Sequence, residues 1–430
     1  MEILAVGTIF DGLGGGANVG FEVLKILPAM GIKVTLQIPV FYLHRSVLAF
    51  ISNSKGVISP LERIKALRDS GVEVPNYIEE RINELFTTYS KRPSDYRNLT
   101  SSYFLYMALR EDRKISKKLR SLKNYDFILC TNEIYPVFKL AMEASYMFRK
   151  IKCLVMAHTE PFKDKSFTKN HRFDANFSFK VRNFTIRRSW QKALKNNTII
   201  GIAVPSMAPI EISGIAQELK EMGISLYVPD PPRCLSSSFY EARSTAGKRG
   251  VIFLSRLVPD KGIFEIPKIV SHLPGRNITL VGSFTRDEDR AKFLKLSEEA
   301  GISVDYMGYV DDRDVPTVLA KHRVLLYPSH ADALSFTVVE SLVVGTSVIA
   351  YDIPAISLNY KGLNTVSIVK EWDVDAMASE ANRILAMQDN DYVKMHESDI
   401  ELGFIQKFKN CQKIYNGYGE WILTLLKNSS

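Results

Sequence analysis

The sequence is poor in cysteine, with only Cys130, Cys153, Cys234 and Cys411 among 430 residues and no C-x-x-C pair. Cysteines paired at short spacing usually mark a zinc site or a disulfide framework, so neither is expected here. We instead predict four buried, reduced thiols, as is usual for a protein of a reducing compartment.

Long apolar stretches are also missing. No run of about 18 uninterrupted apolar residues occurs, which argues against a transmembrane helix. The first residues, from Met1 to Gly7, lack the basic flank and the long apolar core of a signal peptide. These absences predict a cytoplasmic protein, and the length of 430 residues predicts two domains of roughly 200 residues each.

Acidic residues are scarce in the first half of the chain. Residues 1–229 contain 33 Lys and Arg against 21 Asp and Glu, whereas residues 230–430 contain 23 against 26. The net charges of the two halves are therefore +12 and −3. A basic half attracts nucleic acid, anionic lipid or phosphorylated substrates, although surplus surface lysines give the same excess. No RNA- or DNA-binding signature occurs, so nucleic acid is not an expected partner.

What is present is an alternation of strand-like and helix-like segments in two series. Strands are predicted at 3–6, 33–38, 127–130, 153–157 and 198–204, then at 251–254, 278–281, 305–307, 324–327, 347–350 and 365–369. Such alternation predicts an α/β fold with parallel sheets covered by helices. A proline-rich break at 229–232 separates the two series.

We therefore predict two Rossmann-like domains that face each other across a cleft. The N-terminal domain is expected at 1–229 and the C-terminal domain at 230–405. A final helix at 406–430 is expected to pack back on the N-terminal domain. Ligands of open α/β sheets bind at the carboxyl ends of the strands, which is where a cleft between two such domains would lie.

A glycine-rich turn, Asp11-Gly-Leu-Gly-Gly-Gly-Ala-Asn18, follows the first strand. It does not fit G-x-G-x-x-G, and no acidic residue ends the second strand, which argues against an NAD-type site. The glycines either form a tight turn only or provide a backbone surface that a ligand can approach, and we favour the second interpretation.

The second half contains a basic loop and a pair of acids. The loop Arg256-Leu-Val-Pro-Asp-Lys261-Gly262 follows a predicted strand. Asp332 lies on a predicted loop after the strand at 324–327, and Glu340 lies about one turn inside a predicted helix at 336–345. Cations and free amides at a helix N-terminus can bind a diphosphate, and carboxylates can bind sugar hydroxyls. Taken singly, the cations are explained by a charged surface loop and Glu340 by its place near a helix start.

Together these residues resemble the signature of the retaining GT-B glycosyltransferases of family 4 (glycosyl transferases group 1), which include sucrose synthases, sucrose-phosphate synthases and bacterial mannosyltransferases. That signature is an acid, seven residues and a glutamate, preceded by an Arg…Lys-Gly loop. The resemblance covers about residues 250–370, is weaker over 1–25 and 150–210, and is not detectable over 40–125. Asp332 stands where the family usually has Glu, and Ala333 and Ser335 stand where glycines are common, which puts the donor sugar in doubt.

The resemblance implies a role for each residue of the C-terminal motif. Arg256 and Lys261 would hold the nucleotide diphosphate and stabilise it as the leaving group. Asp332 would contact the transferred sugar, and Glu340 would bind the ribose.

Further residues are implied at the edges of the same site. Tyr309 corresponds to the strand end that contacts the base, and Ser335 and Phe336 would supply amides to phosphate or sugar hydroxyls. Across the cleft, Gly15 and Gly16 would lie against the donor phosphates or the acceptor. His158, after the strand at 153–157, would contact the donor sugar, although a lone histidine after an apolar strand is commonly structural.

The implied activity is that of a retaining hexosyltransferase that moves a sugar from a nucleotide-sugar donor to a lipid-linked or glycan acceptor. Because no Asp-x-Asp motif follows a strand end, no metal cofactor is expected. No carboxylate nucleophile is identifiable, and Glu160 is a candidate only through its proximity to His158, so a same-face attack is expected. A nucleotide-sugar epimerase or hydrolase of the same fold, and a non-catalytic nucleotide-sugar-binding protein, stay open as alternatives.

Two basic segments of the N-terminal half, 110–120 and 180–195, contain apolar residues. The second includes Phe184, Ile186 and Trp190. Such segments could rest on an anionic surface at the cytoplasmic face of a membrane, as a peripheral protein does. They are equally explained as amphipathic helices that cover a sheet.

Overall fold

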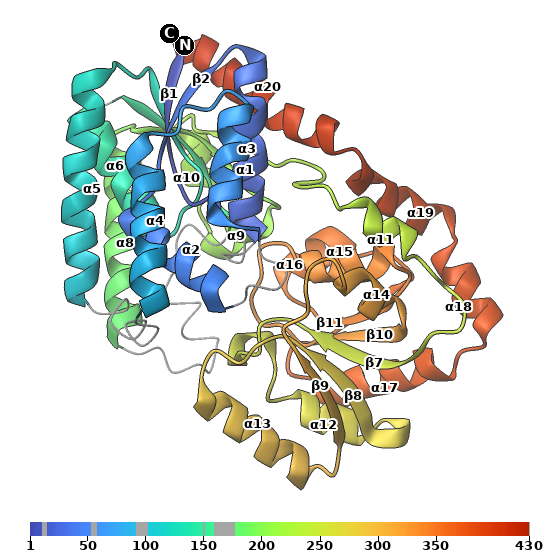
Figure 1. Ribbon diagram of the computed structural model, residues 1–430. Helices are drawn as coiled ribbons and strands as arrows, with labels where there is room; N and C mark the ends of the chain where they lie inside the picture. Colours follow the sequence, from blue (N-terminus) through green and yellow to red (C-terminus); the bar gives the residue numbers. More distant parts are fainter. Residues whose placement is uncertain (11–14, 53–57, 92–101, 149–150, 159–176, 430) are drawn as a thin grey trace.

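The computed structural model describes residues 1–10, 15–52, 58–91, 102–148, 151–158 and 177–429 (Figure 1). The described chain forms two α/β domains, each around a six-stranded sheet. All strand pairs in both sheets are parallel. The predicted fold class is therefore confirmed.

The N-terminal sheet has the strand order β2-β1-β3-β4-β5-β6. Apart from Glu2 and Lys152 at their starts, the central strands β1, β3 and β4 are buried, because helices cover both faces of a parallel sheet. The last strand was not predicted, since it has three residues, all half-buried, and therefore shows no apolar pattern. The bounds are β1 Glu2–Val6, β2 Lys33–Gln37, β3 Phe127–Cys130, β4 Lys152–Met156, β5 Ile199–Ala203 and β6 Ser225–Tyr227.

The C-terminal sheet has the strand order β12-β11-β10-β7-β8-β9. The chain begins in the middle of this sheet, adds β8 and β9 on one side, and then crosses to β10 on the other side. The point between β7 and β10 is a topological switch point, where α/β sheets bind ligands. The bounds are β7 Arg249–Leu254, β8 Asn277–Val281, β9 Ser303–Gly308, β10 His322–Tyr327, β11 Ser347–Tyr351 and β12 Val366–Val369.

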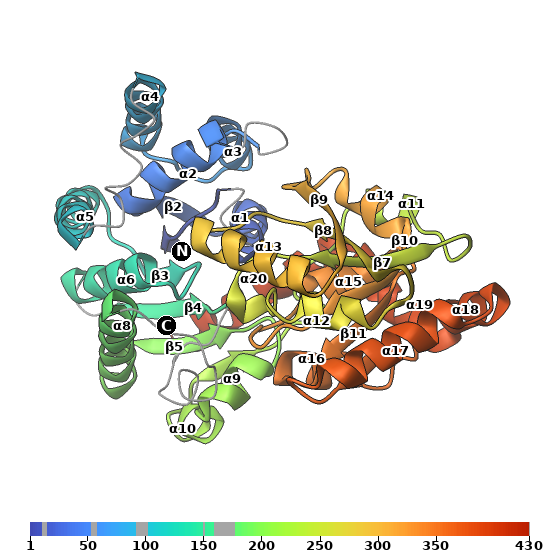
Figure 2. The same ribbon diagram turned by 90° about the horizontal axis from the view of Figure 1, so that it is seen from below.

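Helices connect the strands and cover the sheets of both domains (Figure 2). In the N-terminal domain they are α1 Gly15–Ile26, α2 Val40–Ser52, α3 Pro60–Asp69, α4 Asn76–Lys91, α5 Ser102–Leu122, α6 Tyr135–Met147, α8 Phe177–Lys195, α9 Ala208–Ser213 and α10 Ala216–Glu221. In the C-terminal part they are α11 Ser237–Glu241, α12 Ile266–Ser271, α13 Asp287–Glu299, α14 Val315–Ala320, α15 Phe336–Val343, α16 Pro354–Tyr360, α17 Val374–Ala386, α18 Asp389–His396, α19 Asp399–Gln406 and α20 Cys411–Ser429. Short 3-10 turns lie at Pro28–Met30, Pro259–Lys261, Pro274–Arg276 and Lys407–Lys409.

The last helix, α20, returns to the N-terminal domain and packs against α1 (Figure 1). The indole of Trp421 stacks on Tyr227 with ring centroids 5.3 Å apart and donates a hydrogen bond of 3.1 Å to Ser225 Oγ. The chain therefore crosses between the domains twice, once before β7 and once after α19.

The two crossings are joined by a disulfide between Cys234 and Cys411, whose Cα atoms are 5.0 Å apart. The prediction of four reduced thiols was thus wrong for this pair, while Cys130 and Cys153 are free and buried. Spacing along the chain could not reveal the bond, because 177 residues separate the two cysteines and only the return of the last helix brings them together.

The basic helix α8 does not offer Trp190 to a membrane. Its indole is completely buried and stacks on Phe138, with ring centroids 4.2 Å apart. That part of the surface prediction was wrong, whereas Phe184 is exposed and the side chain of Ile186 lies outside the described residues. In the described chain, no helix combines the length and the apolar character needed to cross a membrane.

Candidate active site

The carboxyl edges of the two sheets face each other. Ser206, which follows β5 of the N-terminal sheet, donates a hydrogen bond from its hydroxyl to the carbonyl of Ala333, which follows β10. The helices α9 and α16 also pack together at this junction. Residues that follow β1 and β4 therefore lie on one side of the junction, and residues that follow β7 and β10 lie on the other.

Lys261 and Asp332 meet at the switch point of the C-terminal sheet. The ammonium of Lys261 lies 3.0 Å from Asp332 Oδ2 and also donates to the carbonyl of Ala331 at 2.8 Å. Gly262 makes this approach possible, because its φ is +75° and a Cβ at this position would lie 2.1 Å from the carbonyl oxygen of Pro328. The glycine after the lysine is thus required for the loop to lie against β10.

Asp332 is held in its ionised form. Burial works to raise its pKa, but Lys261 and the hydroxyl of Tyr327, which donates to Oδ2, outweigh burial and lower the pKa below its usual value. The amide of Ala333 donates to Oδ1 at 3.0 Å. Lys261, Tyr327 and the amide of Ala333 therefore all stabilise the ionised form of Asp332, which can accept hydrogen bonds from sugar hydroxyls.

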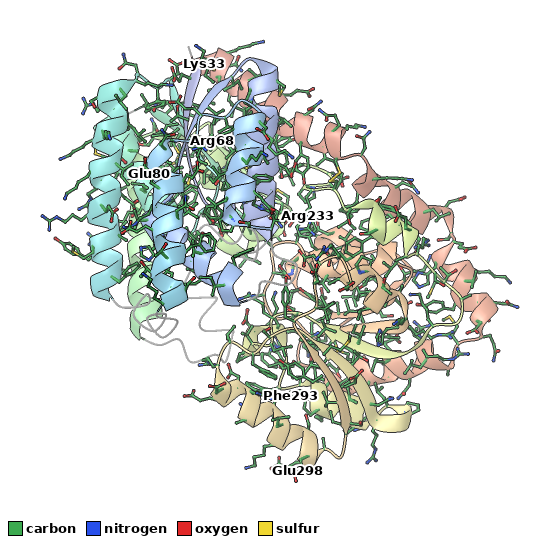
Figure 3. The ribbon with its side chains drawn as sticks, in the orientation of Figure 1. Lys33, Arg68, Glu80, Arg233, Phe293 and Glu298 are labelled. Carbon is green, nitrogen blue, oxygen red and sulfur yellow. A yellow bond between two sulfur atoms is a disulfide. The ribbon has the colours of Figure 1, made fainter. Side chains whose placement is uncertain are left out.

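Glu340, on the first turns of α15, is paired with Arg233. The guanidinium Nη2 lies 2.8 Å from Glu340 Oε1, and the side chains are 17% and 14% exposed respectively. Arg233 also covers the ring of Phe336 at 3.9 Å from its centroid. Burial raises the pKa of Glu340, and Arg233 opposes that rise. Figure 3 shows Arg233 where the two domains meet.

The N-terminus of α15 provides hydrogen-bond donors beside these acids. Ser335 caps the helix, since its hydroxyl accepts from the amide of Val338 at 3.4 Å. The first amides of a helix have no carbonyl partner within it, so those of Phe336 and Thr337 are available to an anionic group.

The remaining C-terminal candidates lie at the surface. Arg256 is exposed, and no acidic side chain in the described part of the chain forms an ion pair with it. Tyr309, just after β9, is 43% exposed. The structure thus joins Lys261 with Asp332 and leaves Arg256 free to contact a ligand.

On the N-terminal side, His158 and Gly16 are in direct contact. A Cβ at Gly16 would lie 2.6 Å from the imidazole of His158, so a glycine is needed for α1 to approach this ring. His158 Nε2 lies 3.2 Å from the carbonyl of Thr131, and its amide donates to Glu133 Oε2 at 2.8 Å. Burial lowers the pKa of His158, which favours the neutral ring, although Glu133 opposes this effect.

Gly15 is the first residue of α1, while residues 11–14 and the candidate Glu160 lie outside the described residues. Among the described residues, no group of three or more His, Cys, Asp or Glu side chains could hold a metal ion. The expectation of metal-independent chemistry stays a prediction.

Sequence reasoning missed Arg233, Thr131 and Glu133. Arg233 directly follows the proline-rich break at 229–232, where an arginine is readily interpreted as a charged linker residue. Thr131 and Glu133 directly follow β3, a strand end next to the switch point between β1 and β3. Their place after a predicted strand was a usable signal for both residues.

The comparison with protein families agrees with this arrangement. Residues 239–400 match the family described as Glycosyl transferases group 1. The chain is a glycosyltransferase. The match covers β7 to α18 and includes Lys261, Asp332 and Glu340. No curated protein matches the sequence of this glycosyltransferase.

Solved structures with the same fold cover the whole chain. The sucrose-phosphate synthase of Thermosynechococcus elongatus is 17% identical, with a TM-score of 0.68 and complete coverage of both chains. HepE of Anabaena, in complex with UDP and glucose, is 15% identical, with a TM-score of 0.61 over 99% of this chain and 100% of its own. The lipopolysaccharide outer core galactosyltransferase WaaB is 14% identical, with a TM-score of 0.60 over 99% of each chain. These likenesses confirm the GT-B fold.

Proposed function

We propose that the protein is a retaining glycosyltransferase of family 4 that moves a hexose from a nucleotide-diphosphate sugar to a lipid-linked or glycan acceptor. The observation that carries this proposal is the ionised Asp332, fixed by Lys261 at the switch point of the C-terminal sheet, next to Ala333, which bonds across the junction to Ser206. Support also comes from HepE, which has the same fold and whose structure contains UDP and glucose.

The geometry suits a donor that lies along the carboxyl edge of the C-terminal sheet. The diphosphate would contact Arg256 and the free amides of α15, where cationic charge and a helix N-terminus stabilise a departing anion. Arg233 occupies Oε1 of Glu340, so Oε2 is the oxygen that ribose hydroxyls would donate to. Asp332 would accept hydroxyls of the hexose.

Retention fits a reaction in which the acceptor attacks from the face that the leaving group departs from. The departing phosphate oxygen then takes the proton of the acceptor hydroxyl, and His158 contacts the donor sugar. No metal is needed for these roles. Transfer that is unchanged by a chelator, with an α-configured product from an α-configured donor, is the expected result. An inverted product would contradict the retaining step.

The first experiment is a thermal-shift screen of UDP-, GDP- and ADP-sugars, because a ligand that binds only the folded state raises the melting temperature. Transfer is then measured for Glu340→Ala and Lys261→Ala, with Lys268→Ala as the control, since Lys268 is exposed on α12. Loss of transfer in the first two variants, with folded far-UV spectra, is expected. Full activity in both would contradict the proposal, and turnover of donor without acceptor would favour an epimerase or hydrolase.

The proposal includes contact with an anionic membrane surface through α5. On this helix Tyr106 is 60% exposed and Met107 39%, beside the exposed cations Arg110 and Lys114. Co-sedimentation with phosphatidylserine vesicles but not with phosphatidylcholine vesicles is the expected result. Equal recovery with both vesicle types would contradict an electrostatic contact.

A further inference from the structure

The two segments that connect the domains run side by side (Figure 1). The first crossing, residues 230–236, leads into α11, and the second crossing, residues 407–411, leads from α19 into α20. The amide of Leu235 in the first crossing donates a hydrogen bond of 2.9 Å to the carbonyl of Phe408 in the second. The disulfide described above joins the same two segments covalently. The path of the first crossing is therefore coupled to that of the second.

Arg233 lies within the first crossing, and both of its neighbours are attached to α20. The carbonyl of Pro232 accepts a hydrogen bond of 2.9 Å from the hydroxyl of Tyr418 on α20. Cys234 is bonded to Cys411, which is the first residue of α20. The last helix of the chain therefore fixes the backbone of Arg233 on both sides, once by a hydrogen bond and once by a covalent bond.

The side chain of Arg233 extends from the crossing to two donor-site residues of α15. Its Nη2 lies 2.8 Å from Glu340 Oε1, and its guanidinium lies 3.9 Å from the ring centroid of Phe336. Its Nε is buried and has no hydrogen-bond partner among the described residues. Because the side chain spans the distance from the crossing to α15, a shift of its backbone would move the guanidinium away from both residues.

A reductant can reach the bond that fixes Arg233. Cys411 is exposed and Cys234 is half-buried, whereas Cys130 and Cys153 are completely buried. Thiol–disulfide exchange requires a thiolate to approach a sulfur, so access decides which cysteines react. The thiol chemistry of the folded chain is therefore expected at the crossings and not in the core of the N-terminal domain.

We propose that the disulfide between Cys234 and Cys411 is a redox-sensitive switch that controls donor binding through Arg233. In the oxidised form, the bond holds Arg233 against Glu340, and the donor site is complete. In the reduced form, the two crossings are no longer joined covalently, Arg233 loses its fixed direction, and the donor binds more weakly. Arg233 is thus a positioning residue for Glu340. The inference rests on the proposed function, because it concerns the regulation of that same donor site.

The electrostatics of Glu340 give the physical reason. Burial raises the pKa of Glu340, and Arg233 opposes that rise. A displaced Arg233 leaves a buried acid without its cation, so its ionised form is less favoured. A protonated carboxyl has one acceptor oxygen fewer for the ribose hydroxyls than a carboxylate has. Weaker binding of the nucleotide therefore follows from the loss of the ion pair.

A dithiol supplies the two electrons and two protons that opening the bond requires. A thiolate of the dithiol attacks the sulfur of the exposed Cys411, the S–S bond breaks, and Cys234 leaves as a thiolate that takes up a proton. The second thiolate of the dithiol then attacks its own sulfur in the mixed disulfide. This step releases Cys411, which is protonated in turn, and closes a cyclic disulfide in the oxidised dithiol.

The test uses the full chain and three probes, UDP, GDP and ADP, because each contains the ribose and the diphosphate of a nucleotide-sugar donor. Affinities are measured by isothermal titration before and after incubation with dithiothreitol. The nucleotide that binds best is expected to bind the reduced protein about three- to tenfold more weakly, since one hydrogen bond to a charged group is lost. Maleimide labelling of the native protein shows that the bond has opened, and far-UV circular dichroism shows that the chain stays folded.

A set of variants distinguishes control through Arg233 from a general loosening of the structure. In Arg233→Ala, reduction is expected to change the affinity by less than about twofold, because the side chain through which the bond acts is gone. Arg286→Ala, which removes an arginine paired with an acid at the exposed start of α13, is the matched control and should respond to reduction as the wild type does. Cys234→Ser/Cys411→Ser should bind as the reduced wild type does and should not respond to dithiothreitol.

Three results would overturn the inference alone. The first is equal affinity of the oxidised and reduced wild type, and the second is an equal loss on reduction in Arg233→Ala and the wild type. The third is loss of the far-UV signal on reduction, which would make the bond structural only. Absence of binding of all three nucleotides to the oxidised protein would instead contradict the proposed function, and the inference with it.

Discussion

In the C-terminal domain both acids of the candidate site have a cation partner. In the N-terminal domain, a cavity between α2, α4 and α5 is lined by Arg110 and Lys114, which form no ion pair with any described residue, and by His44, whose Nε2 has no described hydrogen-bond partner. Asp332 is paired with Lys261, and Glu340 with Arg233. In the cavity, His44 Nε2 has no partner and Lys114 forms no ion pair. The domains share an architecture, but these two sites differ in how far residues of the chain pair their charged and polar groups.

This difference indicates how the two sides of the junction are organised. A buried ion pair fixes the direction of both side chains before a ligand arrives, which suits a donor site that must hold one diphosphate sugar in one position. Polar atoms without a protein partner in a cavity are satisfied by water or by a ligand. The acids of the C-terminal site are therefore fixed by residues of the chain itself, whereas Arg110, Lys114 and the Nε2 of His44 in the N-terminal domain are not.

The largest expected effect comes from breaking the covalent link between the two crossings. Cys234→Ser/Cys411→Ser is expected to lower the free energy of unfolding by about 2–4 kcal/mol, because a bond that closes a long loop restricts the unfolded chain. Urea denaturation measures this change. A reductant should bring the wild type to the level of the variant and leave the variant unchanged. A wild type as stable with reductant as without it would mean that the bond does not form.

Gly16→Ala is expected to disturb the N-terminal side of the junction and to leave the Lys261–Asp332 and Arg233–Glu340 ion pairs intact. The new Cβ would lie 2.6 Å from the imidazole of His158, so the ring or α1 must move. A displacement of about 1 Å in a catalytic group costs roughly 100-fold in kcat. Gly403→Ala is the control, because a Cβ there meets nothing within 4 Å. Equal kcat for Gly16→Ala and the wild type would exclude a role for the position of His158.

The comparison also explains which parts of the molecule the sequence could reveal. Buried parallel strands read as short apolar runs, so the strand at 324–327 and the acids after it were found from pattern alone. Arg233 was missed because its role depends on where the interdomain crossing passes over α15. Local patterns do not encode such contacts between segments 107 residues apart.

Neither the disulfide nor the N-terminal cavity was predicted from the sequence, and the reason is the same for both. Cys234 meets Cys411 only after α20 has returned, and the cavity wall combines residues from three helices over a stretch where no resemblance was detected. The basic character of α5 was visible in the sequence, but which of its cations face an apolar wall depends on how α2 and α4 pack against it. Trp190 shows the converse, since a tryptophan among lysines reads as a surface residue and is in the core.

Arg233→Ala tests whether the Arg233–Glu340 ion pair of the C-terminal domain prepares the donor site. Without the guanidinium, Glu340 loses the cation that opposes the effect of burial on its pKa, and the ring of Phe336 loses its cover. The KM for the donor is expected to rise about tenfold, which is about 1.4 kcal/mol, with a smaller change in kcat. Arg233→Lys should recover part of this loss. Arg286→Ala, on the exposed start of α13, serves as the control, and an unchanged KM in Arg233→Ala would assign the pair to stability alone.

The smallest expected effect concerns the loop between β10 and Asp332, which is fixed by His330. Its ring lies between two carboxylates, with Nε2 3.0 Å from Glu265 and Nδ1 2.7 Å from Glu371, and it stacks on Trp372 at 3.7 Å. Burial lowers the pKa of His330, but the two glutamates outweigh burial and raise it above the ordinary 6.5. Because the folded protein binds the proton more tightly than the unfolded chain, this stabilisation is complete below about pH 6.5 and is lost as the pH rises through the raised pKa.

Stability measured by urea denaturation should therefore fall through this histidine as the pH rises above 6.5. His330→Gln should remove that part of the pH dependence while keeping a hydrogen-bonding side chain between the two glutamates. His272→Gln, at an exposed histidine of the same domain, should leave the pH dependence as in the wild type. If His330→Gln shows the same slope as the wild type, the charge of this histidine does not fix the loop, and the preorganisation of Asp332 depends on Lys261 and Tyr327 alone.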